Sequence, residues 1–515
     1  MRRSIEWRSG MKNERVKKVA AVALAAVLIV SSAVYMIYGV KANTSVASPA
    51  ATETASAGAR EYQSIFKKDG VIDIKIDIAQ EDWKSILDNP TAEEYKSATV
   101  TVNGTTVKNV GFRSKGNLTL RSVANSDSDR YSFRVKLDKY VEGQNLMGLD
   151  EFVVNNMYSD PSYMREYLSY EALREIDADA PEAVFANLYV NGELYGFYLC
   201  VEAVDDSFLE RSFGEKEGNL YKQEQGSTLQ YVEGSNYDKS ELKSGDDESK
   251  EDLKKLIKVL NEMPQGQKGE IESVLEVDSA LRYIAANTVL GNYDSYNGNM
   301  AQNYYLYGQE GKFTVIPWDY NMSIGGFGGG GDGTTIPIDE PVMGVDIKSL
   351  PLISNLLAVD EYKAKYHAYV QDLLDYLQGF EGRVAELADI LRPYVQADPT
   401  KFYTMEQFEA SIKYSETNTD SQQAEQQGPG NGEQPPRNSW VEGQNGNGQA
   451  PPQGRPEGGM KGGPGGGMGM TGNATSIVNF IKERVENIQK QLTGELPTTG
   501  NTTMNGSMRG GDRPF

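Results

Sequence analysis

The first half of the chain alternates apolar and polar residues in a way that predicts β-strands. From Val71 to Ile78, isoleucines alternate with charged residues, which is the period of a strand that buries one face. Two Asn-Gly dipeptides each separate a pair of apolar stretches and predict tight-turn hairpins, 98–102 with 105–110 and 188–190 with 193–201. One helix, over about 162–176, is expected between these hairpins.

In the second half the apolar period becomes that of helices. Apolar residues recur every three or four positions in 253–260 and 281–289, and again at 353–357. A third expected hairpin, 304–307 with 313–316, interrupts these helices. A last helix carries one apolar stripe, formed by Ile477, Phe480, Ile481, Val485, Ile488 and Leu492. Because this stripe is too apolar to remain in water, we expect the helix to dock on the helical half of the domain.

The N-terminal region predicts a membrane segment. No residue from Val19 to Val40 is charged, and a helix of that length crosses the hydrocarbon core of a bilayer. Basic residues at 15, 17 and 18 precede it and place the N-terminus in the cytoplasm. A cleaved signal peptide is the alternative, in which case the protein would be secreted. We therefore expect a single-pass cell-membrane protein with its main domain extracytoplasmic.

Composition divides the chain into segments. Residues 1–18 form the basic N-terminus, 19–40 the transmembrane signal-anchor, and 41–61 an Ala/Ser/Thr-rich stalk. A folded domain is expected over 62–415 and the docking helix over 473–494. Residues 416–472, rich in Gly, Pro, Gln and Asn, and the tail 495–515 are expected to be disordered.

Charge and rare residues exclude several functions. A net charge of −22 and a pI of about 4.7 argue against nucleic acid as a partner, which needs a basic face. Cys200 is the only cysteine, so no intrachain disulfide forms, and we expect it to be buried in a strand. The only histidine, His367, lies on an expected helix beside tyrosines and is expected to be structural. Chemistry is left to carboxylates, amides and lysines.

Three polar residues stand in an order that suits phosphoryl transfer. Asp294 and Asn299 follow a helix with four residues between them, the spacing of a catalytic base and a metal-binding amide. Asp319 follows the third hairpin, where kinases place a magnesium-binding carboxylate. The spacing alone is also typical of turn-forming Asx residues, so its value lies in the order of helix, loop, hairpin and aspartate.

Two segments offer cations for phosphate groups. Arg134 and Lys136 share one face of an expected strand, although a solvated face would show the same alternation. Upstream, the stretch from Gly111 to Asn117 places Arg113 and Lys115 in an expected turn that could cover phosphates.

Together these segments resemble the CotH kinase family, an atypical branch of the protein-kinase-like fold. The resemblance spans about 62–494 and rests on 112–117, 132–139, 188–193 with 196–202, 219–222, 294–299 and 318–319. It implies an α+β fold with a sheet-rich N-terminal half and a helical C-terminal half. It also implies ATP and Mg²⁺, or Mn²⁺, as cofactors and γ-phosphate transfer to Ser or Thr of surface or coat proteins.

The resemblance also implies roles for single residues. Asp294 would accept the hydroxyl proton, Asn299 and Asp319 would hold the metal, and Lys136 would pair with ATP phosphates, with Arg113 nearby. Phe313 would stack on adenine, with core packing as the alternative. Glu202 and Glu171 compete for the role of orienting the lysine or the nucleotide.

Two further features leave the function open. Asn321 stands two residues after Asp319, where a second carboxylate would be expected, so a second metal site would be weaker. The glycine-rich stretch from Gly325 to Gly333 suggests a lid or substrate loop, or a tolerated surface insertion. The alternative to a kinase is a catalytically dormant CotH-fold protein that binds partners or supports the cell surface.

Overall fold

The computed structural model describes residues 61–327, 332–415 and 476–500. The chain divides into two compact units, Met1–Ser56 and Ala57–Phe515, and all described residues belong to the second. The expected membrane segment 19–40 and the expected insertion 416–472 lie outside the described residues. No helix within the described ranges is long and apolar enough to cross a bilayer.

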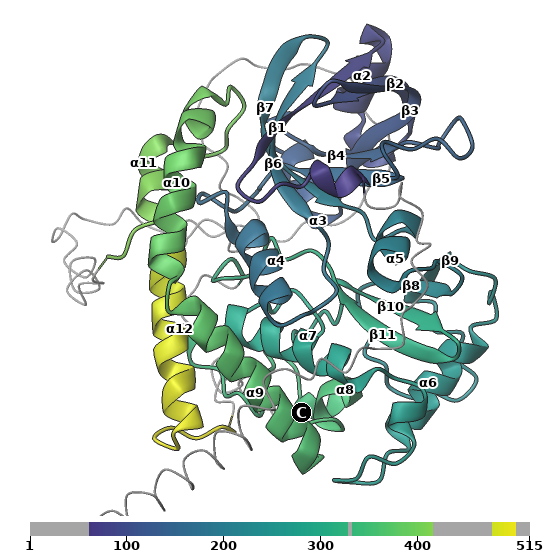
Figure 1. Cartoon of the computed structure of the whole chain (residues 1–515), viewed down its shortest axis with the longest axis vertical. Coiled ribbons are helices and arrows are strands. Elements are labelled where there is room, and N and C mark those ends of the chain that lie inside the picture. Colours follow the sequence, from purple (N-terminus) through teal and green to yellow (C-terminus); the bar gives the residue numbers. More distant parts are fainter. Residues whose placement is uncertain (1–60, 328–331, 416–475, 501–515) are drawn as a thin grey trace, which may run out of the picture. The chain divides into compact units, whose positions relative to one another are not determined.

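The N-terminal half of the described chain forms a closed seven-stranded barrel in the order β1-β2-β3-β4-β5-β7-β6 (Figure 1). Its strands are β1 (Val71–Ile78), β2 (Lys96–Val102), β3 (Thr105–Lys115), β4 (Ser132–Lys136), β5 (Glu151–Asn155), β6 (Ala183–Val190) and β7 (Glu193–Glu202). Parallel pairing of β1 with β6 closes the barrel. Asn103 and Asn191 have positive φ angles, as their tight turns require, so both predicted hairpins are confirmed.

A second, four-stranded sheet has the order β11-β10-β8-β9. It consists of β8 (Asn219–Gln223), β9 (Ser240–Ser244), β10 (Tyr304–Gln309) and β11 (Lys312–Pro317). The third predicted hairpin is therefore β10 and β11, and β8 joins it as a neighbour that the sequence pattern did not reveal.

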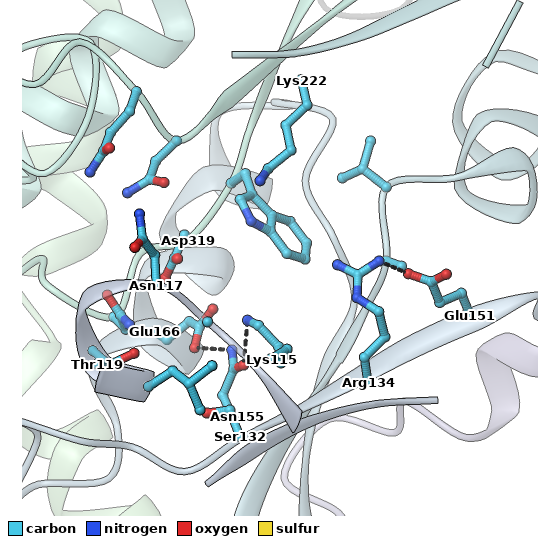
Figure 2. Close-up of a pocket in the computed structure, with 18 of the residues that line it drawn as sticks. Lys115, Asn117, Thr119, Ser132, Arg134, Glu151, Asn155, Glu166, Lys222 and Asp319 are labelled. Atoms are coloured by element: carbon cyan, nitrogen blue, oxygen red, sulfur yellow. Dashed lines mark hydrogen bonds and ion pairs between the residues drawn. The ribbon is translucent and has the colours of Figure 1, made fainter. Parts of the chain in front are cut away.

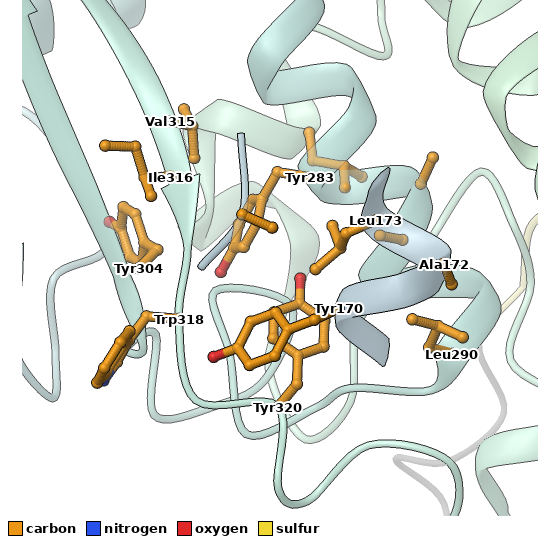
Figure 3. Close-up of a cluster of buried hydrophobic side chains, with 14 of the residues drawn as sticks. Tyr170, Ala172, Leu173, Tyr283, Leu290, Tyr304, Val315, Ile316, Trp318 and Tyr320 are labelled. Carbon is orange, nitrogen blue, oxygen red and sulfur yellow. The ribbon is translucent and has the colours of Figure 1, made fainter. Parts of the chain in front are cut away.

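Most of the described helices follow the barrel strands in the chain. The helices are α2 (Gln80–Asp88), α3 (Leu118–Ala124), α4 (Arg165–Glu175), α5 (Asp206–Phe213), α6 (Glu251–Asn261), α7 (Val277–Leu290), α8 (Pro351–Ser354), α9 (Asp360–Leu377), α10 (Phe380–Ala397), α11 (Met405–Ser411) and α12 (Ile477–Leu492). Figure 3 shows how Tyr170 and Leu173 of α4 meet Tyr283 of α7 and Trp318 after β11 in one buried cluster. This core fixes α4 against the segments that form the site.

Helix α4 is also tied to α10 by an ion-pair network. Arg383 of α10 donates to both carboxylate oxygens of Glu171, at 3.0 and 2.8 Å, and pairs with Asp69 ahead of β1. Glu171, one of the two residues expected to orient a lysine or nucleotide, is therefore already engaged by Arg383.

The last helix, α12, docks on the helical half as predicted. Four residues of its stripe, Ile477, Phe480, Ile481 and Ile488, are buried, and Val485 and Leu492 are partly buried. At its start, Asn479 donates to the backbone oxygen of Ser415 at 2.7 Å and accepts from its backbone N–H at 2.9 Å. The two ends that flank 416–475 therefore meet at one point.

Two smaller expectations can also be placed. Cys200 is buried in β7, as expected, and His367 lies 2.7 Å from the carboxylate of Asp339. The expected loose tail begins with hydrogen-bonded residues, because the oxygen of Thr498 accepts from the backbone N–H of Asp339 at 2.8 Å. Only residues 501–515 of that tail lie outside the described chain.

Candidate active site

A cavity of about 1300 Å³ lies where the barrel, the second sheet and the loop after α7 approach one another. Its walls come from β3, β4 and β5, from the segment after β7, from β8, and from residues on either side of the β10–β11 hairpin. Charged side chains from several elements, among them Lys115, Glu166, Lys222 and Asp319, line this one space (Figure 2).

A lysine and a glutamate of the cavity are joined through the side-chain amide of an asparagine. Lys115 at the end of β3 donates to Asn155 Oδ1 at 3.1 Å, and Asn155 Nδ2 donates to Glu166 Oε2 at 2.8 Å (Figure 2). Burial lowers the pKa of Lys115, although Asp319 opposes this. Burial, together with repulsion from Asp319, raises the pKa of Glu166 to about 8. The relay holds the ammonium group in the cavity.

Asp294 lies in the loop after α7 and is held by two amides. Gln302 Nε2 donates to Asp294 Oδ1 at 2.6 Å, and Asn303 Nδ2 donates to its backbone oxygen at 2.7 Å. Burial, together with the nearby charge of Asp319, raises the pKa of Asp294 to about 7. A carboxylate with such a pKa can take up and release a proton near neutral pH.

Asp319 follows β11 in a left-handed backbone conformation, with φ of 58°. Its backbone N–H donates to the hydroxyl of Tyr170 at 3.3 Å, which fixes the turn against α4. Asp319 Oδ1 and Asn321 Oδ1 are both buried and make no hydrogen bond within the described chain. Two buried oxygen atoms without partners suit a hard divalent cation such as Mg²⁺.

Further cations line the other side of the cavity, and each is paired with a carboxylate. Arg134 pairs with Glu151, and Lys136 lies 3.2 Å from Asp138. Lys222 of β8 lies 2.5 Å from Glu224 and close enough to lower the pKa of Lys115. An anionic ligand would therefore meet positive charge from three elements, β3, β4 and β8.

A comparison with known protein families shows to which family the chain belongs. The sequence model of a family described as CotH kinase protein matches residues 112–424, which is more than half of the 515-residue chain. The chain belongs to the CotH kinase family. It is also 27% identical over 287 residues to inner spore coat protein H of Bacillus subtilis (strain 168), covering 52% of this chain and 75% of that relative.

Four of the residues expected from the CotH resemblance line the cavity. They are Asp294, Asp319, Lys136 and Arg113. Arg113 pairs with Glu93 and lies over the ring of Tyr95, with its guanidinium carbon 5.0 Å from the ring centroid. It therefore stands at the rim and not among the groups around Asp319.

Asn299 is not brought to the cavity. The chain makes a turn in which the backbone N–H of Gly298 donates to the oxygen of Ser295, and Asn299 emerges exposed, outside the cavity wall. The amides that enter the cavity are instead Gln302 and Asn303, and Asn321 supplies the buried oxygen beside Asp319. The D-x-x-x-x-N spacing thus leads to a loop that lines the cavity through Asp294, while Asn299 lies outside the cavity wall.

Phe313 and Glu202 are also placed elsewhere. Phe313 is fully buried in the core beside Tyr221, with ring centroids 6.1 Å apart, so the alternative of core packing holds. Glu202 at the end of β7 accepts from Arg211 Nη2 at 2.8 Å and from the hydroxyl of Tyr62. The aromatic side chains that do line the cavity include Tyr305 and Trp318.

Sequence reasoning missed Lys115 as a central residue, and missed Asn155, Glu166 and Lys222. The sequence predicts a turn around Lys115, whereas in the structure strand β3 continues to Lys115. The strand passes close to Tyr95 and Lys139 at Gly111, where a Cβ atom would lie 2.7 Å from both side chains. Glu166 and Glu171 lie on the same predicted helix, five residues apart and hence on different faces. The helical pattern alone could not say which face meets the cavity.

Proposed function

We propose that this CotH-family chain is an ATP-dependent protein kinase that transfers the γ-phosphate to serine or threonine. The observation that carries the proposal is the convergence of Asp294, Asp319 and Lys115 in one cavity, where Asp319 Oδ1 and Asn321 Oδ1 are buried without a hydrogen-bond partner among the described residues. A base, a metal-binding carboxylate and a phosphate-binding cation are the parts that phosphoryl transfer requires.

The proposed nucleotide lies with its phosphates toward Lys115, Arg134 and Lys222. The adenine ring of ATP would occupy the less polar part of the cavity, lined by Leu199, Ala203, Val204, Leu220 and Tyr305. A triphosphate carries enough negative charge to displace the carboxylates that now pair with Arg134 and Lys222.

The proposed metal ion is held by Asp319 and Asn321. No group of three or more His, Cys, Asp or Glu that could hold a metal occurs within the described residues, so phosphate oxygens and water must complete the coordination. Bound Mg²⁺ or Mn²⁺ would neutralise charge on the phosphates during transfer.

Asp294 is the proposed base. It would accept the proton from the acceptor hydroxyl, and Gln302 and Asn303 orient its carboxylate and its loop for that task. Lys115 would draw charge from the phosphates while the Asn155 relay to Glu166 keeps its ammonium group in place.

The proposed acceptors are proteins of a cell or spore surface. The Bacillus subtilis relative is named as an inner spore coat protein, and the segment 19–40 would place the domain outside the membrane. Acidic composition argues for protein and against nucleic acid as a partner.

The full chain, purified in detergent, tests the proposal with labelled ATP and Mg²⁺. Asp294→Asn should abolish labelling and retain nucleotide binding, whereas Asp319→Asn should lose metal-dependent binding. Asn299→Ala, on the exposed side of the loop, is the matched control and should remain active. Nucleotide binding without transfer by the unaltered chain would support the dormant binding protein instead, for which the carboxylate pairing of the cavity cations is the favouring observation.

A further inference from the structure

One aromatic residue of α12 lies against three glycines. Phe480 is 1% exposed, and a Cβ atom added at Gly291 would lie 2.4 Å from its Cζ atom. The corresponding distances are 2.9 Å to Cδ2 from Gly325 and 3.4 Å to Cε2 from Gly333. Any side chain at the first two positions would collide with the ring, so Phe480 occupies space that only glycine leaves open.

The glycines belong to the segments that carry the two cavity aspartates. Gly291 ends α7 three residues before Asp294, and Gly325 follows Asp319 by six residues. The backbone N–H of Ile324 donates to the oxygen of Leu290 at 2.7 Å and joins the two segments beside the ring. Phe480 therefore touches both segments at the point where they are joined.

One helical turn further along α12, a buried arginine reaches the same region. Arg484 is fully buried and donates to the backbone oxygen of Thr288 from Nε and Nη2, at 3.1 and 2.9 Å. It also donates to the oxygens of Thr334 and Ile336, at 3.2 and 2.7 Å. Because Thr288 lies in the last turn of α7, the guanidinium charge meets the negative end of that helix.

The same segment continues the contact to α4. The oxygen of Ile324 accepts from Arg165 Nε at 3.2 Å, and the hydroxyls of Ser323 and Ser169 lie 2.6 Å apart. Arg165 precedes Glu166, which orients Asn155 and through it Lys115. A shift of α12 would therefore displace the segments of Asp294 and Asp319 and the side chains that hold Lys115.

We propose that α12 is a positioning element, in which Phe480 and Arg484 hold the segments of Asp294 and Asp319 at the separation that phosphoryl transfer needs. This inference rests on the proposed kinase function. Displacements of about 1 Å far from the reacting atoms can lower a rate by about a hundredfold, so a helix that fixes two catalytic segments controls the rate without touching a substrate.

Phe480→Leu tests the inference, with Ile481→Ala as the matched control. Ile481 is the next residue of α12 and is also buried, but it shares a groove with Leu377 and Phe380 and not with the catalytic segments. In the full chain, Phe480→Leu should lower kcat by about tenfold or more and change the KM for ATP far less. Ile481→Ala should lower the melting temperature at least as much and leave kcat within about twofold.

A second substitution provides a rescue. Gly333 has ordinary backbone angles and its added Cβ would meet the ring at 3.4 Å, so Gly333→Ala should refill part of the space that Phe480→Leu opens. The double variant should recover kcat over Phe480→Leu. Loss of kcat in simple proportion to melting temperature in both single variants, or unchanged kcat in Phe480→Leu, would overturn the inference.

Hydrogen exchange separates this inference from the proposed function, because it requires no activity. Phe480→Leu should accelerate exchange in 291–303 and 319–326, whereas Ile481→Ala should not. If the unaltered chain transfers no phosphate, the kinase proposal fails, and the exchange pattern still decides whether α12 holds these segments. Equal exchange in the two variants would contradict the positioning role.

Discussion

At the scale of single residues, the protonation of Asp294 should set the pH dependence of activity. Its pKa is raised to about 7 by burial and by Asp319, and a base must be deprotonated to act. A metal ion at Asp319 would offset the repulsion from that carboxylate, so the acid limb should lie below about 7, with the rate falling about tenfold for each pH unit below the pKa of Asp294. Gln302→Leu removes a hydrogen bond that lowers the pKa of Asp294, so the acid limb should move to higher pH. A profile of kcat/KM between pH 5 and 9 checks this, and an unshifted limb would exclude Asp294 as the titrating base.

Two lysines compete for the phosphates, and substitution distinguishes them. Lys115 is held in the cavity by Asn155 and lies beside Asp319, whereas Lys136 pairs with Asp138 nearer the rim. Lys115→Met should lower kcat/KM by about a hundredfold or more, and Lys136→Met by less than about tenfold. Steady-state kinetics at saturating metal measure both. The reverse order would restore the interpretation made from sequence.

The two predicted aspartates that line the cavity follow a local signal in the sequence. Asp294 and Asp319 stand at the ends of a helix and a hairpin, and those ends are marked by the chain itself. Asn155 and Glu166 are different, because they face the cavity only through the packing of α4 against the barrel and α7. Long-range packing of this kind has no signature in a single sequence.

At the scale of elements, the network around Arg383 should stabilise the fold. Arg383 pairs with Glu171, whose side chain is only 6% exposed, so its loss leaves that buried carboxylate with the exposed Lys68 as its remaining ion-pair partner. Arg383→Met should lower the free energy of unfolding by about 2–4 kcal/mol. Arg392→Met on the same helix, in more exposed pairs with Asp389 and Glu409, should cost less than about 1 kcal/mol. Urea unfolding measures both free energies, and equal decreases would show that the Arg383–Glu171 pair contributes no more to stability than the exposed pairs of Arg392.

Elements were predicted best where composition and period agreed. The Asn-Gly hairpins and the last helix were correct because turn residues and one apolar stripe define them locally. The short strand β9 and helix α3 were not predicted, since neither carries an apolar period long enough to distinguish it from a loop. The closure of the barrel by β1 and β6 is a pairing between distant segments and leaves no local pattern.

At the scale of the whole molecule, the segment between α11 and α12 should be dispensable while α12 is not. Residues 420–470 are too polar to bury a core, and closing a shorter loop costs little entropy. Deleting them should leave the melting temperature within a few degrees and activity nearly unchanged. Truncation after residue 472 should give an unstable product, because the apolar surface under Phe480 and Ile481 would be exposed. Calorimetry on both forms provides the measurement, and a large loss on internal deletion would show that the segment contributes to folding.

The hydrogen bonds between Ser415 and Asn479 hold the two ends of that segment together. Because these two positions are in contact, the stability of the folded domain depends only weakly on the length of the sequence between them. The sequence between these positions could therefore change in length or composition during evolution without altering the packing of the core. The same property makes this point a natural place to graft a reporter or a tether onto the protein.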